Sequence, residues 1–84
     1  MFKTLRSPRQ QHLQNLLIEL RKSRGLTQTD VATRLGRPQS FVAKYEGGER
    51  RLDVVEFLDV AQALGADPRA VLADLIVRTT ASPK

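Results

Sequence analysis

The sequence contains no cysteine and no tryptophan, and its aromatic residues are three phenylalanines and one tyrosine among 84 residues. Without cysteine, a disulfide framework, a thiolate metal site and a cysteine nucleophile are excluded. No apolar run is longer than four residues, whereas a membrane-spanning helix needs about 20. No apolar segment follows the first three residues, so a signal peptide is not indicated. We therefore expect a cytoplasmic protein.

A chain of this length is sufficient for one small domain with a single core. Because aromatic residues are few and β-branched runs are short, the core must consist mostly of Leu, Val, Ile and Ala, which favours packed helices over a β-sandwich. We expect one all-α domain over residues 1–84, with a core at about residues 8–77 and a disordered tail at residues 79–84.

Positive charge is concentrated in the first part of the chain. Residues 1–51 contain eleven Lys or Arg against four Asp or Glu, a net charge of +7, whereas residues 52–84 carry a net charge of −2. A basic part beside a mildly acidic one is typical of a protein that binds a polyanion. A basic protein without a particular partner would have the same composition, so charge alone leaves both interpretations open.

Local start and stop signals predict five helices. Ser7-Pro8 begins the first, because Ser caps a helix and Pro is tolerated at its first position. The capping pairs Thr27 with Asp30 and Asp53 with Glu56 begin the second and the fourth helix, and Asp67-Pro68 begins the fifth. The third runs from about Pro38 to Glu46. The expected apolar faces are, in chain order, Leu13, Leu16, Leu17 and Leu20; Val31, Ala32 and Leu35; Val42 and Tyr45; Val54, Phe57, Leu58, Ala61 and Leu64; and Val71, Leu72, Leu75 and Ile76.

The connection between the second and third helices is very short. Gly36 ends the second helix, and at most Arg37 and Pro38 separate it from the third. Two short helices joined by so tight a turn must cross steeply, as in a helix-turn-helix unit. Ala32 is small where the two helices must approach each other closely.

Three stretches have a recognisable pattern. They are Arg-x-x-x-Gly-Leu-Thr-Gln-x-x-Val-Ala-x-x-Leu-Gly from Arg21, Val42-x-x-Tyr45-Glu46-x-Gly48, and Leu58-x-x-Ala61-x-x-Leu64-Gly65. The pattern resembles the phage repressor and Cro type of helix-turn-helix domain, often called XRE-like, over roughly residues 10–76. The resemblance implies a compact five-helix bundle of the lambda-repressor type, whose third helix enters the major groove of double-stranded DNA.

At about 100° per residue, Gln39, Ser40, Ala43 and Lys44 share one arc of the third helix. Gln can bind adenine through two hydrogen bonds, Lys can bind guanine, and Ala can contact the methyl group of thymine. We expect direct base contacts from Gln39, Ser40 and Lys44, and an apolar contact from Ala43. A solvated polar face is the alternative.

Phosphate contacts are expected where the second helix begins, because free N–H groups and the positive end of the helix dipole favour an anion. Thr27 and Gln28 lie there, and the resemblance implies that the glutamine binds phosphate. Arg37 in the turn is a further candidate, as are Arg50 and Arg51 in the loop that follows the third helix.

The resemblance also implies that Arg21 and Glu46 form an ion pair between the first and third helices. We expect this pair to have a structural role rather than to contact DNA. Two unrelated surface charges are the alternative.

No catalytic or metal-binding arrangement is visible. His12 is the only histidine, and neither a Ser-His-acid set nor a metal-ligand cluster occurs at suitable spacing. We therefore expect neither an enzyme nor a cofactor.

The prediction is a DNA-binding transcriptional regulator, specifically a repressor that binds a palindromic operator as a homodimer. Leu75 and Ile76 are the expected interface residues, with Phe2 and Leu5 as a second patch. The alternative is an antitoxin-type protein that neutralises a partner toxin and regulates its own operon. Sequence-independent binding of nucleic acid is a third interpretation.

Overall fold

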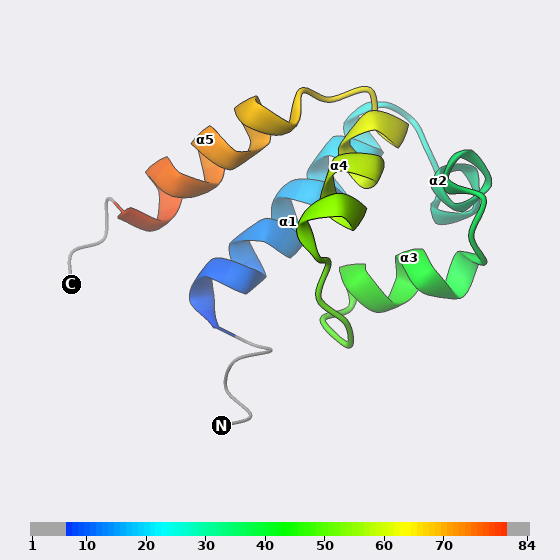
Figure 1. The fold of residues 1–84 in the computed structure, drawn as a ribbon, viewed down its shortest axis with the longest axis horizontal. Helices are drawn as coiled ribbons and strands as arrows, with labels where there is room; N and C mark the ends of the chain where they lie inside the picture. The colour runs from blue at the N-terminus through cyan, green and yellow to red at the C-terminus, as the bar shows by residue number, and fades with distance from the viewer. Residues whose placement is uncertain (1–6, 81–84) are drawn as a thin grey trace.

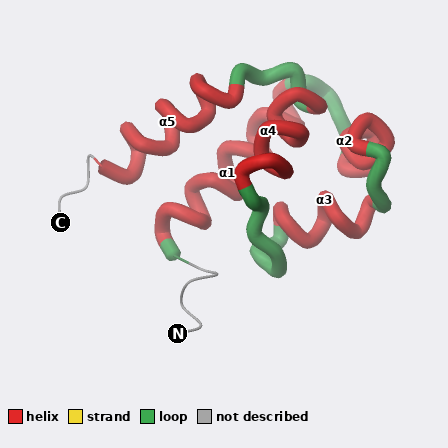
Figure 2. Tube along the Cα trace, viewed as in Figure 1, coloured by secondary structure: helices red, strands yellow, loops and turns green. Residues whose placement is uncertain are grey.

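The computed structural model describes residues 7–80, which form five helices and no strand (Figures 1 and 2). The prediction of an all-α, five-helix domain is confirmed. Phe2, Leu5 and residues 81–84 lie outside the described residues. The helices are α1 (Pro8–Ser23), α2 (Gln28–Leu35), α3 (Gln39–Glu46), α4 (Val54–Ala63) and α5 (Pro68–Thr80).

The helices begin where the capping residues predict. The Ser7 side chain accepts a hydrogen bond from the Gln10 N–H at 3.1 Å, ahead of Pro8. Both α2 and α4 begin with complete capping boxes, formed by Thr27 with Asp30 and by Asp53 with Glu56. In each box the side chain of one residue accepts a hydrogen bond from the backbone N–H of the other. Backbone N–H groups that have no partner within the helix are thereby paired.

The turn between α2 and α3 depends on Gly36. This residue has φ +69°, in the left-handed region that side chains with a Cβ disfavour. Pro38 then precedes α3 in an extended conformation and has no side-chain cap hydrogen bond. The turn places α2 and α3 against each other at one end of the molecule, while α5 lies along α1 at the other (Figure 1).

The core is aliphatic, as the composition predicts, and it lies where α1, α2, α3 and α4 meet. Phe41, Tyr45 and Phe57 are its aromatic members. The ring centroids of Phe41 and Tyr45 are 5.6 Å apart in an edge-to-face arrangement. The largest fully buried side chains are Leu17, Val31, Val42, Val60 and Leu64.

Two assignments on α4 are wrong. Val54 and Leu58 were expected to face the core, but both are exposed. The buried arc of α4 is centred on Phe57, Val60 and Ala61, and Leu58 lies about 100° away from Phe57 around the helix. Val60, which the apolar spacing did not select, is completely buried in place of these residues.

Helix α5 also differs from expectation. Leu72 is exposed rather than part of the core, whereas Leu75, expected at a dimer interface, is only 8% exposed within the single chain. The helix continues through Thr79, where a tail was expected, and the Thr79 hydroxyl donates to the Leu75 carbonyl at 2.8 Å. Arg9 donates to the same hydroxyl oxygen at 3.1 Å, which fastens this end of α5 to α1.

Candidate nucleic-acid interface

Helix α3 presents a polar arc to solvent. Gln39, Ser40 and Lys44 are exposed and Ala43 is half-buried. On the opposite side, Val42 and Tyr45 are buried in the core, and burial raises the pKa of Tyr45. The side chains selected as base-contact candidates therefore lie on one accessible side of a helix whose other side is fixed by packing.

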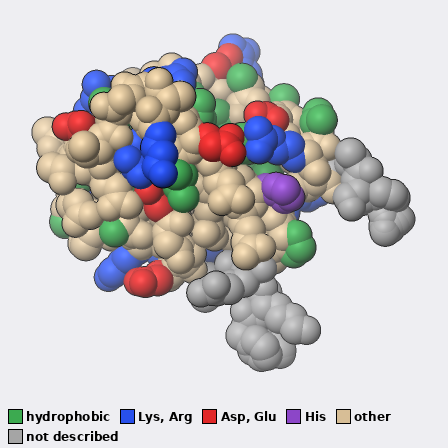
Figure 3. All heavy atoms as spheres, turned by 180° about the vertical axis from the view of Figure 1, so that it is seen from behind, with side chains coloured by type: hydrophobic (Ala, Val, Ile, Leu, Met, Phe, Trp, Pro, Cys, Tyr) green, Lys and Arg blue, Asp and Glu red, His purple; other side chains and the backbone are tan. Residues whose placement is uncertain are grey.

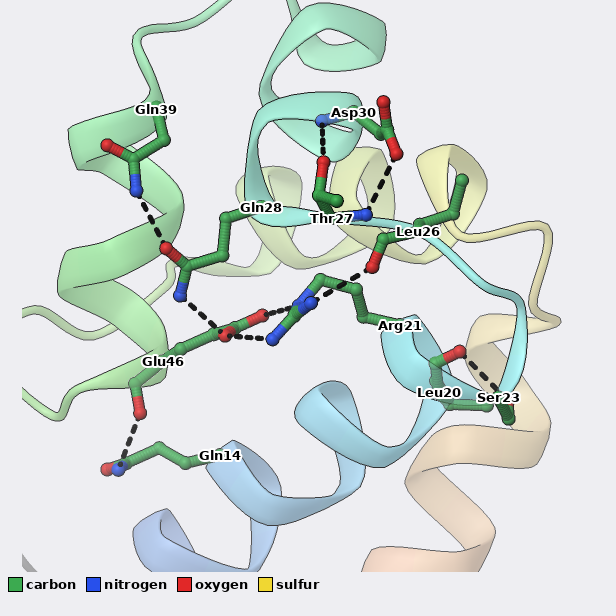
Figure 4. Close-up of polar contacts among 10 residues, drawn as sticks. All are labelled: Gln14, Leu20, Arg21, Ser23, Leu26, Thr27, Gln28, Asp30, Gln39 and Glu46. Atoms are coloured by element: carbon green, nitrogen blue, oxygen red, sulfur yellow. Dashed lines mark hydrogen bonds and ion pairs between the residues drawn. The ribbon is translucent and has the colours of Figure 1, made fainter.

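An ion pair joins α1 to the end of α3. The Nε of Arg21 donates to Glu46 Oε2 at 2.7 Å, and Nη2 donates to Oε1 at 3.1 Å (Figure 4). Arg21 Nη1 also donates to the Leu26 carbonyl, at 2.9 Å. The Arg21 and Glu46 side chains are only 13% and 5% exposed. The pair therefore lies inside the fold and fixes the C-terminal end of α3.

The buried carboxylate is linked to the exposed arc through Gln28. The Nε2 of Gln28 donates to Glu46 Oε1 at 2.9 Å, and its Oε1 accepts a hydrogen bond from Gln39 Nε2 at 2.7 Å (Figure 4). A continuous set of hydrogen bonds thus runs from Arg21 to Gln39. Sequence reasoning missed it, because Gln28 and Gln39 lie on different helices and no local spacing relates them.

The start of α2 lies beside this network. The Thr27 hydroxyl accepts from the Asp30 N–H at 3.0 Å, and Asp30 accepts in return from the Thr27 N–H at 2.9 Å. The hydrogen bond from the Thr27 backbone lowers the pKa of Asp30. Thr27 thus serves as the helix cap, while Gln28 belongs to the network that reaches the exposed arc.

Two of the arginines proposed to bind phosphate lie close to one aromatic ring. The guanidinium carbons of Arg37 and Arg50 are 4.5 Å and 4.9 Å from the centroid of Phe41. Both arginines also pair with Glu56, at 3.8 Å from Arg37 and 2.6 Å from Arg50. The hydrogen bond from Arg50, followed by that from the Asp53 backbone, lowers the pKa of Glu56 to about 2.

Sequence reasoning assigned Glu56 only to a helix cap. The spacing of six residues between Arg50 and Glu56 is a weak signal, since a loop and a helix start lie between them. The remaining candidate in this loop, Arg51, is exposed. It lines, together with Arg9, a cavity of about 210 Å³ at the start of α1.

The described residues contain neither a metal-binding cluster nor a membrane-spanning helix. Within residues 7–80, no group of three or more His, Asp or Glu residues could hold a metal ion. None of the described helices is long and apolar enough to span a membrane. On the face opposite to that in Figure 1, acidic and basic side chains are interspersed rather than separated (Figure 3).

This geometry is shared with known proteins. Residues 13–75 match a family described as a helix-turn-helix domain. The chain is 51% identical to an XRE-family like protein from Pseudomonas syringae pv. tomato str. DC3000, with 93% of this chain and 95% of that chain covered and a TM-score of 0.85. It is 36% identical to the restriction-modification controller protein C.AhdI from Aeromonas hydrophila, with 70% and 89% covered and a TM-score of 0.66.

A curated relative is similar over a shorter stretch. An uncharacterized HTH-type transcriptional regulator, y4dJ, from Sinorhizobium fredii (strain NBRC 101917 / NGR234) is 41% identical over 46 residues, which are 55% of this chain. The matched stretch spans 60% of that relative's length.

The fold and the outward arc of α3 define a helix-turn-helix DNA-binding domain. The chain belongs to the helix-turn-helix family, and within it to the XRE-like transcriptional regulators. Proteins of this family bind double-stranded DNA and are not enzymes. The predictions of the family and of a non-enzymatic protein are therefore confirmed.

Proposed function

We propose that this protein is a cytoplasmic transcriptional repressor that binds a palindromic operator as a homodimer, with α3 in the major groove. The observation that carries the proposal is the exposed arc of α3, which a buried ion pair fixes to α1. Such an arc offers an amide, a hydroxyl and an ammonium group at the surface of a helix, and a helix fits the major groove.

In this proposal, Gln39, Ser40 and Lys44 contact base edges and Ala43 contacts a thymine methyl group. The hydrogen bond from Gln39 Nε2 to Gln28 uses one of its two N–H groups. The second N–H and the carbonyl oxygen remain for adenine, which needs one donor and one acceptor. Gln28 thereby fixes the direction in which the Gln39 amide is presented.

Phosphate contacts are proposed for the residues around this arc. Thr27 and Gln28 lie at the start of α2, where the helix dipole favours an anion. Arg37 and Arg51 are exposed near the two ends of α3. Contacts of this kind position a protein on the duplex without selecting a sequence.

The homodimer is proposed because one helix-turn-helix unit reads only one half-site. Dimers of this class bind half-sites about 34 Å apart, which is one turn of DNA. Exposed apolar side chains suitable for an interface occur on α4 and α5, whereas Leu75 is mostly buried within the chain and can contribute little area. The exposed large apolar residues are Val54, Val55, Leu58, Leu72, Ile76 and Val77. Repression would follow if the bound dimer covers the site that polymerase needs.

The proposal is tested by selecting duplexes that the protein binds from a random pool. We expect a recovered palindrome whose half-site centres are about 34 Å apart. Recovery of single, unpaired half-sites would contradict the dimer, and recovery of no common sequence would contradict specific readout. A reporter gene placed behind the recovered site then separates repression from activation.

A further inference from the structure

One carboxylate, that of Glu56, lies against two of the arginines at the candidate DNA interface. Arg37 comes from the turn before α3, Arg50 from the loop after it, and Glu56 from the first turn of α4. Phe41 of α3 lies close to both guanidinium groups. The cluster therefore joins the segments on both sides of α3 to the start of α4.

The hydrogen-bonding capacity of Arg50 is largely used inside the protein. Its Nη1 donates to Glu56 Oε1 and to the Arg51 carbonyl, both at 2.8 Å, and its Nη2 donates to Glu56 Oε2 at 2.6 Å. This is a bidentate guanidinium–carboxylate pair, the strongest geometry that such a pair adopts. The edge formed by Nη1 and Nη2 is thus engaged with a carboxylate that balances its charge, and Nε and one N–H of Nη2 are the remaining donors.

Arg37 is held differently. Its Nη2 is 3.8 Å from Glu56 Oε2, which is beyond hydrogen-bond distance, and 45% of its side chain is exposed. Stacking on the Phe41 ring supports the guanidinium without using its N–H groups. Its donors can therefore turn to a phosphate at low cost.

Glu56 is itself firmly placed. It accepts the Asp53 N–H at 3.0 Å as part of the α4 capping box, and its side chain is only 13% exposed. The carboxylate cannot follow Arg50 away from this position without breaking the cap. To bind phosphate through Nη1 and Nη2, Arg50 would have to leave both Glu56 and the Arg51 carbonyl.

We propose that Glu56 is a positioning residue of the DNA interface, which holds Arg50 in the fold and leaves Arg37 to bind a backbone phosphate. This inference rests on the proposed DNA-binding function. It assigns different roles to two arginines that the sequence places in the same class. Arg37 binds phosphate, whereas Arg50 links the loop after α3 to the start of α4 through its ion pair with Glu56.

The test uses the salt dependence of DNA binding, because each phosphate contact that is lost reduces the slope of log K against log salt concentration by about one. We expect Arg37→Gln to reduce the slope by about one, and Arg50→Gln to leave the slope unchanged. Thermal unfolding without DNA supplies a second readout. The unfolding temperature should fall more for Arg50→Gln than for Arg37→Gln.

Glu56→Gln directly tests whether the Glu56 carboxylate holds Arg50. Glutamine can still close a capping box, but it removes the charge that holds Arg50. Arg50 should then reach phosphate, so that the slope steepens by about one and binding to unrelated duplexes tightens. Asp74→Asn is the matched control, because it removes one negative charge from the exposed ion pair between Asp74 and Arg78 on α5. Its slope should equal that of the unmodified protein.

A slope that falls by about one for Arg50→Gln, with an unchanged unfolding temperature, would overturn the inference. A slope for Glu56→Gln equal to that of the Asp74→Asn control would also overturn it. Failure of DNA binding itself would look different, since the unmodified protein would then bind no duplex at any salt concentration.

Discussion

The Nε of Arg21 lies 2.7 Å from Oε2 of Glu46, so that a residue near the end of α1 holds the last residue of α3. The same carboxylate accepts a hydrogen bond from Gln28, which in turn accepts one from Gln39. The position of the polar arc on α3 therefore depends on a buried charge pair that does not itself belong to the arc.

Arg21→Ala should destabilise the fold much more than Arg24→Ala. Removing one partner of a buried pair leaves an uncompensated charge and costs about 3–5 kcal/mol. Arg24 is exposed, and its contacts to Ser23 and the Gly65 carbonyl are long, at 3.3 Å and 3.4 Å. Its loss should cost about 1 kcal/mol or less. Urea unfolding of the two variants measures the difference, and equal free energies of unfolding would show that the ion pair does not stabilise the fold.

The contribution of Glu56 to stability should disappear in acid. The pKa of its carboxyl is lowered in the folded chain from 4.5 to about 2, mainly by the hydrogen bond from Arg50. A lowered pKa means that the stabilisation is fully present above pH 4.5 and is lost as the pH falls toward 2. The free energies of unfolding of the unmodified protein and of Glu56→Gln should therefore differ at pH 6 and converge near pH 2. A difference that is the same at both pH values would show that the charge of Glu56 is unimportant.

The dimer is expected to depend on the exposed side of α5. Ile76→Asp introduces a charge at an exposed position, so the monomer should remain folded while the dimer weakens. Sedimentation at tens of micromolar would show a shift toward monomer. Val54→Asp, on α4, is the comparison variant and should leave the dimer intact. Dissociation by Val54→Asp alone would show that the interface lies on α4. If the unmodified protein is a monomer both free and on DNA, the dimer is refuted.

Much of the fold could be predicted because its signals are local. The capping boxes at Thr27 and Asp53 each act within four residues, and the left-handed turn at Gly36 requires no distant partner. The faces of α4 and α5 were harder to predict. Val54 and Leu58 fit an apolar spacing, but which arc of a helix is buried depends on where its neighbours lie.

The exposed residues of the candidate site could be predicted from the sequence, but the hydrogen bonds and ion pairs between them could not. The exposure of Gln39, Ser40 and Lys44 follows from helical periodicity once Val42 and Tyr45 are assigned to the core. The contact of Gln28 with Gln39, and that of Arg50 with Glu56, arise from the packing of separate elements. Residue type alone made Arg37 and Arg50 equivalent, and the structure distinguishes them by their distances to Glu56 and by the hydrogen bond from Arg50 to the Arg51 carbonyl.

Lys44 and Arg51 should respond differently to truncation if α3 reads the bases. A phosphate is the same beside every base, whereas the edges of the bases in the major groove are not. Arg51→Ala should therefore weaken binding to every duplex alike and reduce the salt slope by about one. Gln39→Ala should change the preference at one base pair, and Lys44→Ala at another.

If the exposed arc of α3 selects the DNA sequence, Lys44→Ala should distinguish a selected duplex from its scrambled counterpart when the variant is titrated on both. We predict a loss of about 1–3 kcal/mol on the selected duplex, relaxed preference at one base pair in each half-site, and little change on the scrambled one. An equal loss of affinity for both duplexes would show that Lys44 contacts only the backbone and that α3 does not select the sequence through this residue.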